Sequence, residues 1–443
     1  MKNVVVFGAG MAGLSVAYEL SKNNVKVDLL EKDSQVGGLA KSFTKDGFTV
    51  DLGPHAFLIK DKEMLDTIKK LLKDNKLIHN TRKSRIYVEG KYFDWPLKIF
   101  NTILTLSPLV SMKIFFEYLA IKTKKNKIDD SFESYTINRF GKSLYEIFLK
   151  DYNTKLLGLS PNNISIDWAK QRIGLNGIAD IIKQALFKNK NQTRTNKRKF
   201  YFPEQGGIGS IPLKFLEAIK NKDCKVYLNS FPIKIKKNMI TFSNKKQEIT
   251  KKYDAVISTI PLTESIKLLD DVPEDIKKSA SNLKFRSTIF VYLVLKKEKF
   301  GKDHWIYFPH SEGEIFFNRL TEFKNFSEKT CPKDKTIVCA EITCNFEGKT
   351  WNLDEKTLIK NVKDKLIDLD FIKEAEVLDN FIRKEKYAYV VYDTNYSNNK
   401  DKVLRFLEEN GIYSIGRFAS FCHKNMAYSI DLGFKLARSL LLK

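Results

Sequence analysis

The stretch Val4-Val5-Val6-Phe7-Gly8-Ala9-Gly10-Met11-Ala12-Gly13, close to the start of the 443-residue chain, decides the fold. Four apolar residues with a preference for strands predict a buried strand over 4–7, and the Gly-x-Gly-x-x-Gly turn leads directly into a helical pattern. A second apolar strand over 25–30 ends at Glu31. Strand, glycine turn, helix, strand and acid in this order predict a dinucleotide-binding βαβ unit.

Each part of this unit has a physical task. Gly8 permits the tight turn, Gly10 lets the backbone approach a pyrophosphate, and Gly13 lets the helix pack closely on the strand. The helix N-terminus directs free N–H groups at phosphates, and Glu31 stands where a carboxylate accepts hydrogen bonds from a ribose. The predicted cofactor contacts of the unit are Gly8, Gly10, Met11, Ala12, Gly13, Glu31 and Lys32.

A Gly-Gly pair, Gly37-Gly38, follows the acid and is itself followed by Leu39. Such a pair lets the chain pass close over a ligand. Acid, short spacer and Gly-Gly together resemble the extended fingerprint of the amine oxidase and protoporphyrinogen oxidase superfamily, to which UDP-galactopyranose mutase belongs. The resemblance implies FAD as the cofactor rather than NAD.

Further motifs, spread from about residue 3 to residue 440, resemble the mutases. They are Gly53-Pro54-His55-Ala56-Phe57, Phe132-Glu133, Arg139 to Glu146, Asn318 to Lys324, Gly416-Arg417 and Asn425-Met426. By this resemblance His55 and Arg319 are the candidate catalytic residues, and a helix beginning near Asn425 directs its positive end at the flavin. The cofactor contacts added here are Gly37, Gly38, Leu39, Gly53, Pro54, His55, Ile233, Thr259, Gly416, Arg417, Asn425 and Met426.

Three of these residues also have a purely structural interpretation. His55 either lies by the flavin, tuning its redox state or exchanging a proton with substrate, or caps the Gly-Pro turn. Arg319 either lies near the flavin and substrate or pairs with Glu322. Arg417 either lies near the pyrophosphate or forms a surface ion pair.

The chain departs from the mutases at positions that hold their nucleotide. Leu157 replaces a tryptophan that stacks on uracil, and Phe421 and His423 replace two tyrosines that hold the diphosphate. No partner is found for the mutase arginines that clamp the diphosphate. The stretches 153–173 and 201–212 instead resemble protoporphyrinogen-oxidase-like proteins associated with polysaccharide synthesis, so the chain sits between the two families.

The amino-acid composition limits the possible cofactors, partners and cellular compartment. Five scattered cysteines without a Cys-x-x-Cys pair predict neither a disulfide framework nor a metal site, and they fit a reducing cytoplasm. The net charge of +24 suits anionic substrates or an anionic membrane surface, although a lysine-rich composition spread over solvated faces is favoured. The dense basic run from Lys188 to Lys199 lacks interleaved aromatic residues, so nucleic-acid binding is not expected.

The most apolar stretch runs from Ile99 to Met112, between Lys98 and Lys113. It is too short to span a bilayer as a helix. We predict a buried helix pair broken at Pro108, and a membrane-surface anchor is the alternative.

The predicted fold class is α/β, and α+β overall: a Rossmann-like doubly wound FAD domain with a substrate domain made of helices and an antiparallel sheet. The FAD domain is expected to be discontinuous. Its predicted parts are residues 1–95, 196–265 and 401–443, with a helical cap over 96–195 and a substrate-domain sheet over 266–400.

Because the flavin carries the difficult chemistry, no nucleophilic side chain is required. The leading hypothesis is a cytoplasmic FAD-dependent oxidoreductase, in which flavin N5 accepts a hydride from a small polar substrate. By resemblance, that substrate is a precursor in cell-envelope polysaccharide synthesis. The first alternative is a mutase that uses reduced FAD to interconvert the pyranose and furanose rings of a nucleotide sugar. The second is a flavin-binding protein without turnover. The sequence is compatible with a homodimer. It is also compatible with a peripheral membrane contact, although that contact is not favoured.

Overall fold

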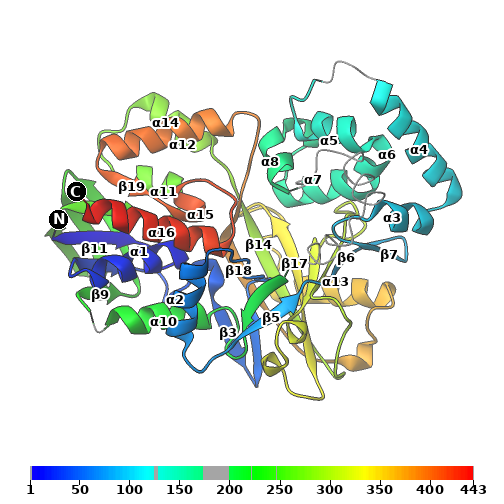
Figure 1. The fold of residues 1–443 in the computed structure, drawn as a ribbon, viewed down its shortest axis with the longest axis horizontal. Helices are drawn as coiled ribbons and strands as arrows, with labels where there is room; N and C mark the ends of the chain where they lie inside the picture. The colour runs from blue at the N-terminus through cyan, green and yellow to red at the C-terminus, as the bar shows by residue number, and fades with distance from the viewer. Residues whose placement is uncertain (1, 124–127, 173–198, 221, 246, 443) are drawn as a thin grey trace.

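The computed structural model describes residues 2–123, 128–172, 199–220, 222–245 and 247–442. A five-stranded parallel sheet forms its first domain (Figure 1). In spatial order, its strands are β19 (Ile412–Ser414), β13 (Ala255–Ser258), β1 (Asn3–Phe7), β2 (Lys26–Leu30) and β9 (Cys224–Tyr227). Strands from the start, middle and end of the chain meet in one sheet, and the predicted α/β fold class is confirmed.

Two hydrophobic cores cover the opposite faces of this sheet, because successive strand residues point to opposite sides. Val4 and Val6 belong to one core and Val5 and Phe7 to the other. The helices of the first core are α1 (Met11–Lys22), α2 (Lys62–Leu72), α10 (Ser210–Lys220) and α16 (Met426–Leu441). Those of the second include α11 (Leu262–Ile266), α12 (Glu274–Asn282) and α14 (Tyr396–Glu409). Helix α16 lies along α1 (Figure 1).

Smaller antiparallel sheets and one short helix surround this domain. A three-stranded sheet consists of β10 (Ser230–Lys236), β11 (Met239–Asn244) and β12 (Gln247–Lys252). Two two-stranded sheets pair β3 (Ser42–Lys45) with β4 (Phe48–Asp51) and β5 (Leu77–Thr81) with β8 (Lys199–Pro203). The short helix α15 (Gly416–Ala419) follows β19.

A seven-stranded sheet forms the second domain. In spatial order, its strands are β18 (Val377–Val390), β14 (Phe285–Leu295), β17 (Thr336–Cys344), β16 (Arg319–Glu322), β15 (Trp305–Tyr307), β6 (Ser84–Val88) and β7 (Lys91–Asp94). Helix α13 (Glu355–Asp368) packs on β14 and β18. The strand pair β6–β7 is a hairpin that turns at Glu89-Gly90. It joins this sheet, although the sequence groups it with the FAD-binding residues 1–95.

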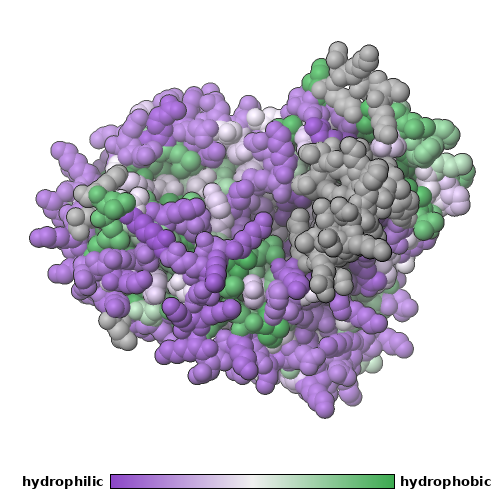
Figure 2. Space-filling view, in the orientation of Figure 1, coloured by the Kyte–Doolittle hydropathy of each residue, from purple (hydrophilic) through white to green (hydrophobic). Residues whose placement is uncertain are grey.

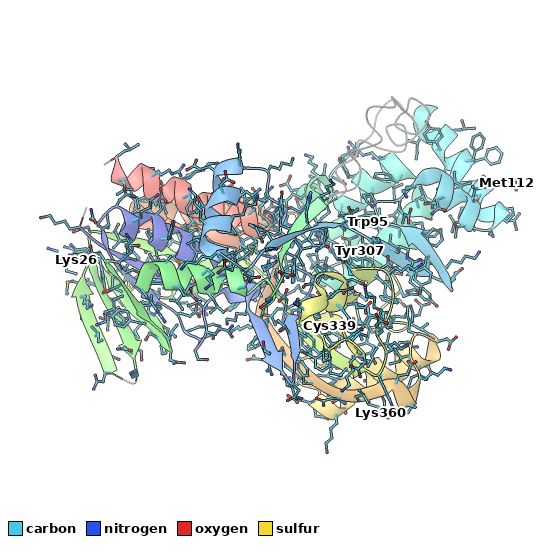
Figure 3. All side chains as sticks on the ribbon, turned by 60° about the horizontal axis from the view of Figure 1, so that its bottom comes forward. Lys26, Trp95, Met112, Tyr307, Cys339 and Lys360 are labelled. Carbon is cyan, nitrogen blue, oxygen red and sulfur yellow. The ribbon has the colours of Figure 1, made fainter. Side chains whose placement is uncertain are left out.

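A helical lobe stands beside the seven-stranded sheet, and Trp95 and Tyr307 meet at its base with ring centroids 6.0 Å apart (Figures 1 and 3). Its described helices are α3 (Ile99–Thr105), α4 (Pro108–Thr123), α5 (Phe132–Phe140), α6 (Lys142–Tyr145), a π-helical turn (Glu146–Lys150), α7 (Asp151–Leu157) and α8 (Ile166–Arg172). The predicted basic run from Lys188 to Lys199 lies outside the described residues except for Lys199.

The prediction of a buried helix pair over 99–112 is wrong in one respect. The break at Pro108 is confirmed, since α3 ends at Thr105 and α4 begins at Pro108. The predicted burial of the segment is wrong, because Leu104 and Leu109 are 84% and 75% exposed. A segment that is apolar on nearly every side has no periodicity to say which side faces solvent. Within the described residues, no helix has both the length and the apolar character needed to cross a membrane.

Candidate active site

A cleft of about 1130 Å³ lies between the carboxyl ends of the parallel strands and the face of the seven-stranded sheet. Open α/β sheets bind their ligands at this edge. Every predicted cofactor contact lines the cleft except Gly13 and Gly53. Both candidate catalytic residues, His55 and Arg319, line it too. Residues predicted from distant parts of the sequence are therefore brought together in one place.

The glycine turn is shaped by close backbone packing. Gly8 has φ of +90°, and a Cβ there would stand 2.6 Å from Thr259 Oγ1. A Cβ on Gly13 would stand 1.9 Å from the Gly8 carbonyl oxygen, so only glycine lets α1 begin so close to β1. Gly10 differs, because a Cβ there meets nothing within 4 Å in the protein. Its open side leaves room for a ligand to approach the backbone.

The Gly-Gly pair closes over this turn. Gly37 and Gly38 both have positive φ, at +118° and +56°, which is a backbone conformation that favours glycine. Gly37 N donates a 2.8 Å hydrogen bond to the Ala9 carbonyl, and a Cβ on Gly38 would lie 3.3 Å from Gly10 Cα. The pair thus forms a second wall beside the glycine turn.

Glu31 ends β2 inside the cleft. Its Oε2 accepts a hydrogen bond from Ala9 N at 2.8 Å, and its Oε1 accepts one from Asp33 N at 3.0 Å. Burial raises the pKa of this carboxyl, and the two backbone hydrogen bonds oppose the rise. The carboxylate therefore braces the glycine turn from behind, and its predicted contact with a ribose stays a prediction.

His55 faces the cleft from the Gly-Pro turn. Its Nδ1 lies 3.2 Å from the Gly53 carbonyl oxygen, so it contacts the turn as well as lining the cleft. Burial lowers the pKa of His55 to about 4, and the nearby positive charges of Arg319 and Arg417 act in the same direction. His55 is therefore neutral at physiological pH. A neutral imidazole with Nδ1–H bound to a carbonyl presents Nε2 as an acceptor.

Arg319 pairs with Glu341 and not with Glu322, so the predicted ion pair is wrong in its partner. Arg319 Nε and Nη2 donate to the two Glu341 carboxylate oxygens, each at 2.6 Å. Glu322 instead accepts from the backbone N–H groups of Phe300 and Gly301. Residues three apart on a strand point to opposite faces, which is why Arg319 and Glu322 cannot meet.

Further cations gather at the same end of the cleft, and sequence reasoning missed most of them. Arg172 at the end of α8 lines the cleft and stacks over Trp168, with its guanidinium carbon 4.8 Å from the ring centroid. Arg417 donates to the Ala388 carbonyl at 2.7 Å and lies 2.8 Å from His423 Nδ1. The signal in the sequence was faint: Trp168 and Arg172 are one helical turn apart.

Arg172, Arg417 and Lys424, here called the cation cluster, have no carboxylate in ion-pair contact among the described residues. Among these residues Arg417 therefore forms no surface ion pair, which was the alternative predicted for it; its guanidinium contacts the Ala388 carbonyl and His423 instead. Within the same part of the chain, Arg417 Nε is buried without a hydrogen-bond partner. Burial lowers the pKa of Arg417 to about 10, with Arg172 adding to the effect. Burial and the surrounding cations also push the pKa of His423 well below its ordinary value. Within the described residues, the three cations of the cluster thus stand without an ion-pair partner.

The N-terminus of α16 lines the cleft beside this cluster. Asn425 caps the helix, because its side-chain oxygen accepts a hydrogen bond from Tyr428 N at 3.0 Å. The cap leaves other first-turn N–H groups free, and the helix dipole adds positive potential at this end. The residues present therefore fit FAD: an open glycine turn for the diphosphate at one part of the cleft, and a positive helix end for the flavin at another.

Comparison with known proteins agrees with this geometry. Residues 11–366 match the model of the family described as flavin containing amine oxidoreductase. The coproporphyrinogen III oxidase of Staphylococcus aureus is 24% identical over 287 residues, and the match covers 59% of this chain but only 60% of that oxidase. The protoporphyrinogen oxidase of Dictyostelium discoideum is 22% identical, with 86% of each chain covered.

The solved structure of a reduced UDP-galactopyranose mutase shares the fold, with a TM-score of 0.87 and 22% identity over 100% of this chain and 96% of the mutase. Fold, family match and cleft agree with the resemblance drawn from Gly8 to Gly38. The chain therefore belongs to the flavin-containing amine oxidoreductase family, and the predicted class of enzyme, an oxidoreductase that uses FAD, is confirmed.

Proposed function

We propose that this protein oxidises a small polar substrate that carries negative charge, and that the substrate is a precursor in cell-envelope polysaccharide synthesis. The observation that carries the proposal is the cation cluster at one end of the cleft. Bound FAD supplies a hydride acceptor at its N5 atom. The chain's own residues select and orient the substrate.

The charge argument favours an anion over an amine. Three cations that have no carboxylate partner in the described part of the chain attract a phosphate or carboxylate and repel a protonated amine. The FAD diphosphate does not account for all of them. Arg172 belongs to α8 in the helical lobe, whereas the glycine turn belongs to the parallel sheet. Arg172 and its neighbour Gln171 are therefore the candidates for holding the anionic end of the substrate.

A nucleotide-sugar mutase that works with reduced FAD is the second candidate. Two observations favour it: the likeness to the mutase fold over the whole chain, and arginines in the cleft that the sequence alone did not locate. Two others oppose it. Leu157 stands where the mutases stack uracil and Phe421 where they hold the diphosphate. Each is 1% exposed and belongs to the second core, so neither can make its nucleotide contact.

The deciding experiment follows the visible absorbance of the oxidised, anaerobic, FAD-loaded protein as candidate compounds are added in turn. Loss of the oxidised-flavin band with a phosphorylated or nucleotide sugar, and none with a neutral sugar or an amine, supports the oxidation. Formation of a furanose sugar only after reduction with dithionite, without prior bleaching, indicates the mutase. Bleaching by an amine alone overturns the anionic substrate.

A matched pair of variants tests the role assigned to Arg172. Arg172→Gln removes the charge that faces the cleft, and we expect the substrate concentration for half-maximal bleaching to rise by roughly tenfold or more. Lys142→Gln is the control, because Lys142 is an exposed cation of the same lobe that does not line the cleft. Equal behaviour of the two variants would remove Arg172 from the proposal.

We also propose a cytoplasmic location. All five cysteines are free, which suits a reducing compartment.

A further inference from the structure

The outer end of the helical lobe carries an apolar surface that nothing in the described chain covers. We call it the outer patch. Its members are Leu104, Leu109, Met112, Phe115, Phe116 and Leu119, and their exposed fractions run from 43% to 84%. Figure 2 shows apolar surface gathered at this end of the molecule, where Figure 1 places α4, and Figure 3 shows Met112 at the tip. A contiguous apolar patch of this kind marks an interaction surface.

Helical spacing accounts for the patch. Leu109, Met112, Phe116 and Leu119 recur at three- and four-residue intervals, so they lie along one face of α4. Ile114 points the other way and is 2% exposed in the small core under the helix. The helix thus fills its own lobe with one face and presents a second apolar face to the outside.

In the segment 97–121, which carries the patch, the exposed charges are lysines, Lys98 and Lys113. Glu117 is the single carboxylate between residues 97 and 121, and it is turned inward, where it accepts hydrogen bonds from Ser143 N and Ser143 Oγ at 2.8 Å each. Lys113 remains exposed among the apolar side chains. The whole chain adds a net charge of +24. An anionic surface would be drawn to this end of the molecule.

We propose that the outer patch docks the protein on the surface of an anionic lipid bilayer. Interfacial helices bury Phe, Leu and Met side chains at the boundary of headgroups and acyl chains, and lysines at their edge reach back to the phosphates. The patch lies at a projecting tip, so it can enter a bilayer surface without the rest of the molecule intervening (Figures 1 and 3). A second copy of the chain offers no reason for the one-signed charge, since two such tips would repel each other.

Co-sedimentation of the full FAD-loaded chain with vesicles tests the proposal. The vesicles are phosphatidylcholine alone, or phosphatidylcholine mixed with phosphatidylglycerol. We expect binding to the mixed vesicles that weakens as salt is added. We expect the double variant Met112→Ser/Phe116→Ser to bind the vesicles at least about tenfold more weakly. It lacks two apolar side chains that the bilayer would bury. Lys113→Glu should weaken binding to the anionic vesicles alone.

Met239→Ser is the matched control, because Met239 is a 40% exposed methionine on β11, away from the helical lobe. Retained FAD absorbance and an unchanged melting temperature show that each variant is folded. Absence of binding to the mixed vesicles overturns the proposal. So does equal binding by wild type and the double variant. A concentration-dependent dimer that the double variant abolishes would assign the patch to a second copy instead.

Discussion

Arg319 and Glu341 lie directly opposite each other on β16 and β17 and are joined by two 2.6 Å hydrogen bonds. Glu341 also lies against the Gly53 turn, since a Cβ on Gly53 would stand 3.0 Å from its carboxylate. One ion pair thus connects the seven-stranded sheet to the loop that carries His55. Arg319 and Glu341 both line the cleft, so the Arg319 charge is balanced within it.

We predict that Glu341→Gln destabilises the protein by roughly 3–5 kcal/mol, because it leaves the buried Arg319 charge without its partner. Urea unfolding measures the loss. The control is Asp379→Asn, which breaks the exposed pair with Lys45 and should cost about 0–1 kcal/mol. Similar losses for the two variants would contradict the importance given to the Arg319 pair.

Gly10→Ala and Gly13→Ala should separate cofactor binding from folding. A Cβ on Gly10 meets no protein atom within 4 Å. We therefore expect unchanged apoprotein stability but FAD binding weaker by roughly tenfold or more, since the added carbon blocks the approach of the pyrophosphate. Gly13→Ala forces α1 away from β1 and should lower stability and FAD binding together. Flavin-fluorescence titration and thermal melting measure the two effects. Full FAD affinity in Gly10→Ala would place the diphosphate elsewhere.

Asp51 should make stability fall as the pH rises toward neutrality. Burial raises the pKa of Asp51 to about 7, against hydrogen bonds from Ser42 Oγ and Ile208 N. Between its ordinary pKa of 3.8 and about 7, the folded state holds a proton that the unfolded chain releases. This contribution is present at acid pH and is lost as the pH rises through 7.

Asp51→Asn removes that titration while its side-chain oxygen can still accept both hydrogen bonds. We expect the variant to gain stability relative to wild type as the pH goes from about 5 to 8. Urea unfolding at several pH values gives the difference between the two free energies. A difference that does not change with pH would show that Asp51 is ionised throughout.

The pKa of His55, lowered to about 4, predicts how its protonation affects activity. Because His55 stays neutral above that value, we expect no ionisation of His55 in the rate profile between about pH 5 and 8. His55→Asn should lower the rate of flavin reduction without changing the shape of the profile. Stopped-flow absorbance checks this. An inflection near pH 6.5 that disappears in the variant would mean that His55 titrates normally.

Local patterns were enough to find the segments that line the cleft, because each segment is short and has its own backbone geometry. The turn from Gly8 to Gly13, the pair Gly37-Gly38 and the cap at Asn425 each carry their own geometric requirement. Their meeting at one edge then follows from the rule that parallel strands bind ligands at their carboxyl ends. The FAD prediction needed no knowledge of long-range packing.

The predictions that were wrong or incomplete depended on contacts between distant segments. The partner of Arg319 is set by the register of β16 against β17, which no short pattern encodes. The exposure of Leu109 depends on which side of α4 meets the rest of the lobe, and an all-round apolar helix gives no sign of it. Arg172 reaches the cleft because α8 packs against the second core of the parallel-sheet domain, a contact between distant segments.

Helices α1 and α16 pack closely together, although they come from opposite ends of the chain. A Cβ on Gly433 would stand 2.0 Å from Ser15 Oγ, so the two helices touch almost backbone to backbone. Helix α1 therefore completes its packing only with a segment that follows it by some four hundred residues. A chain that ends before α16 lacks both this contact and the helix N-terminus that lines the cleft. We therefore expect firm flavin binding to require synthesis of the last helix, and a chain truncated before Met426 to bind FAD more weakly.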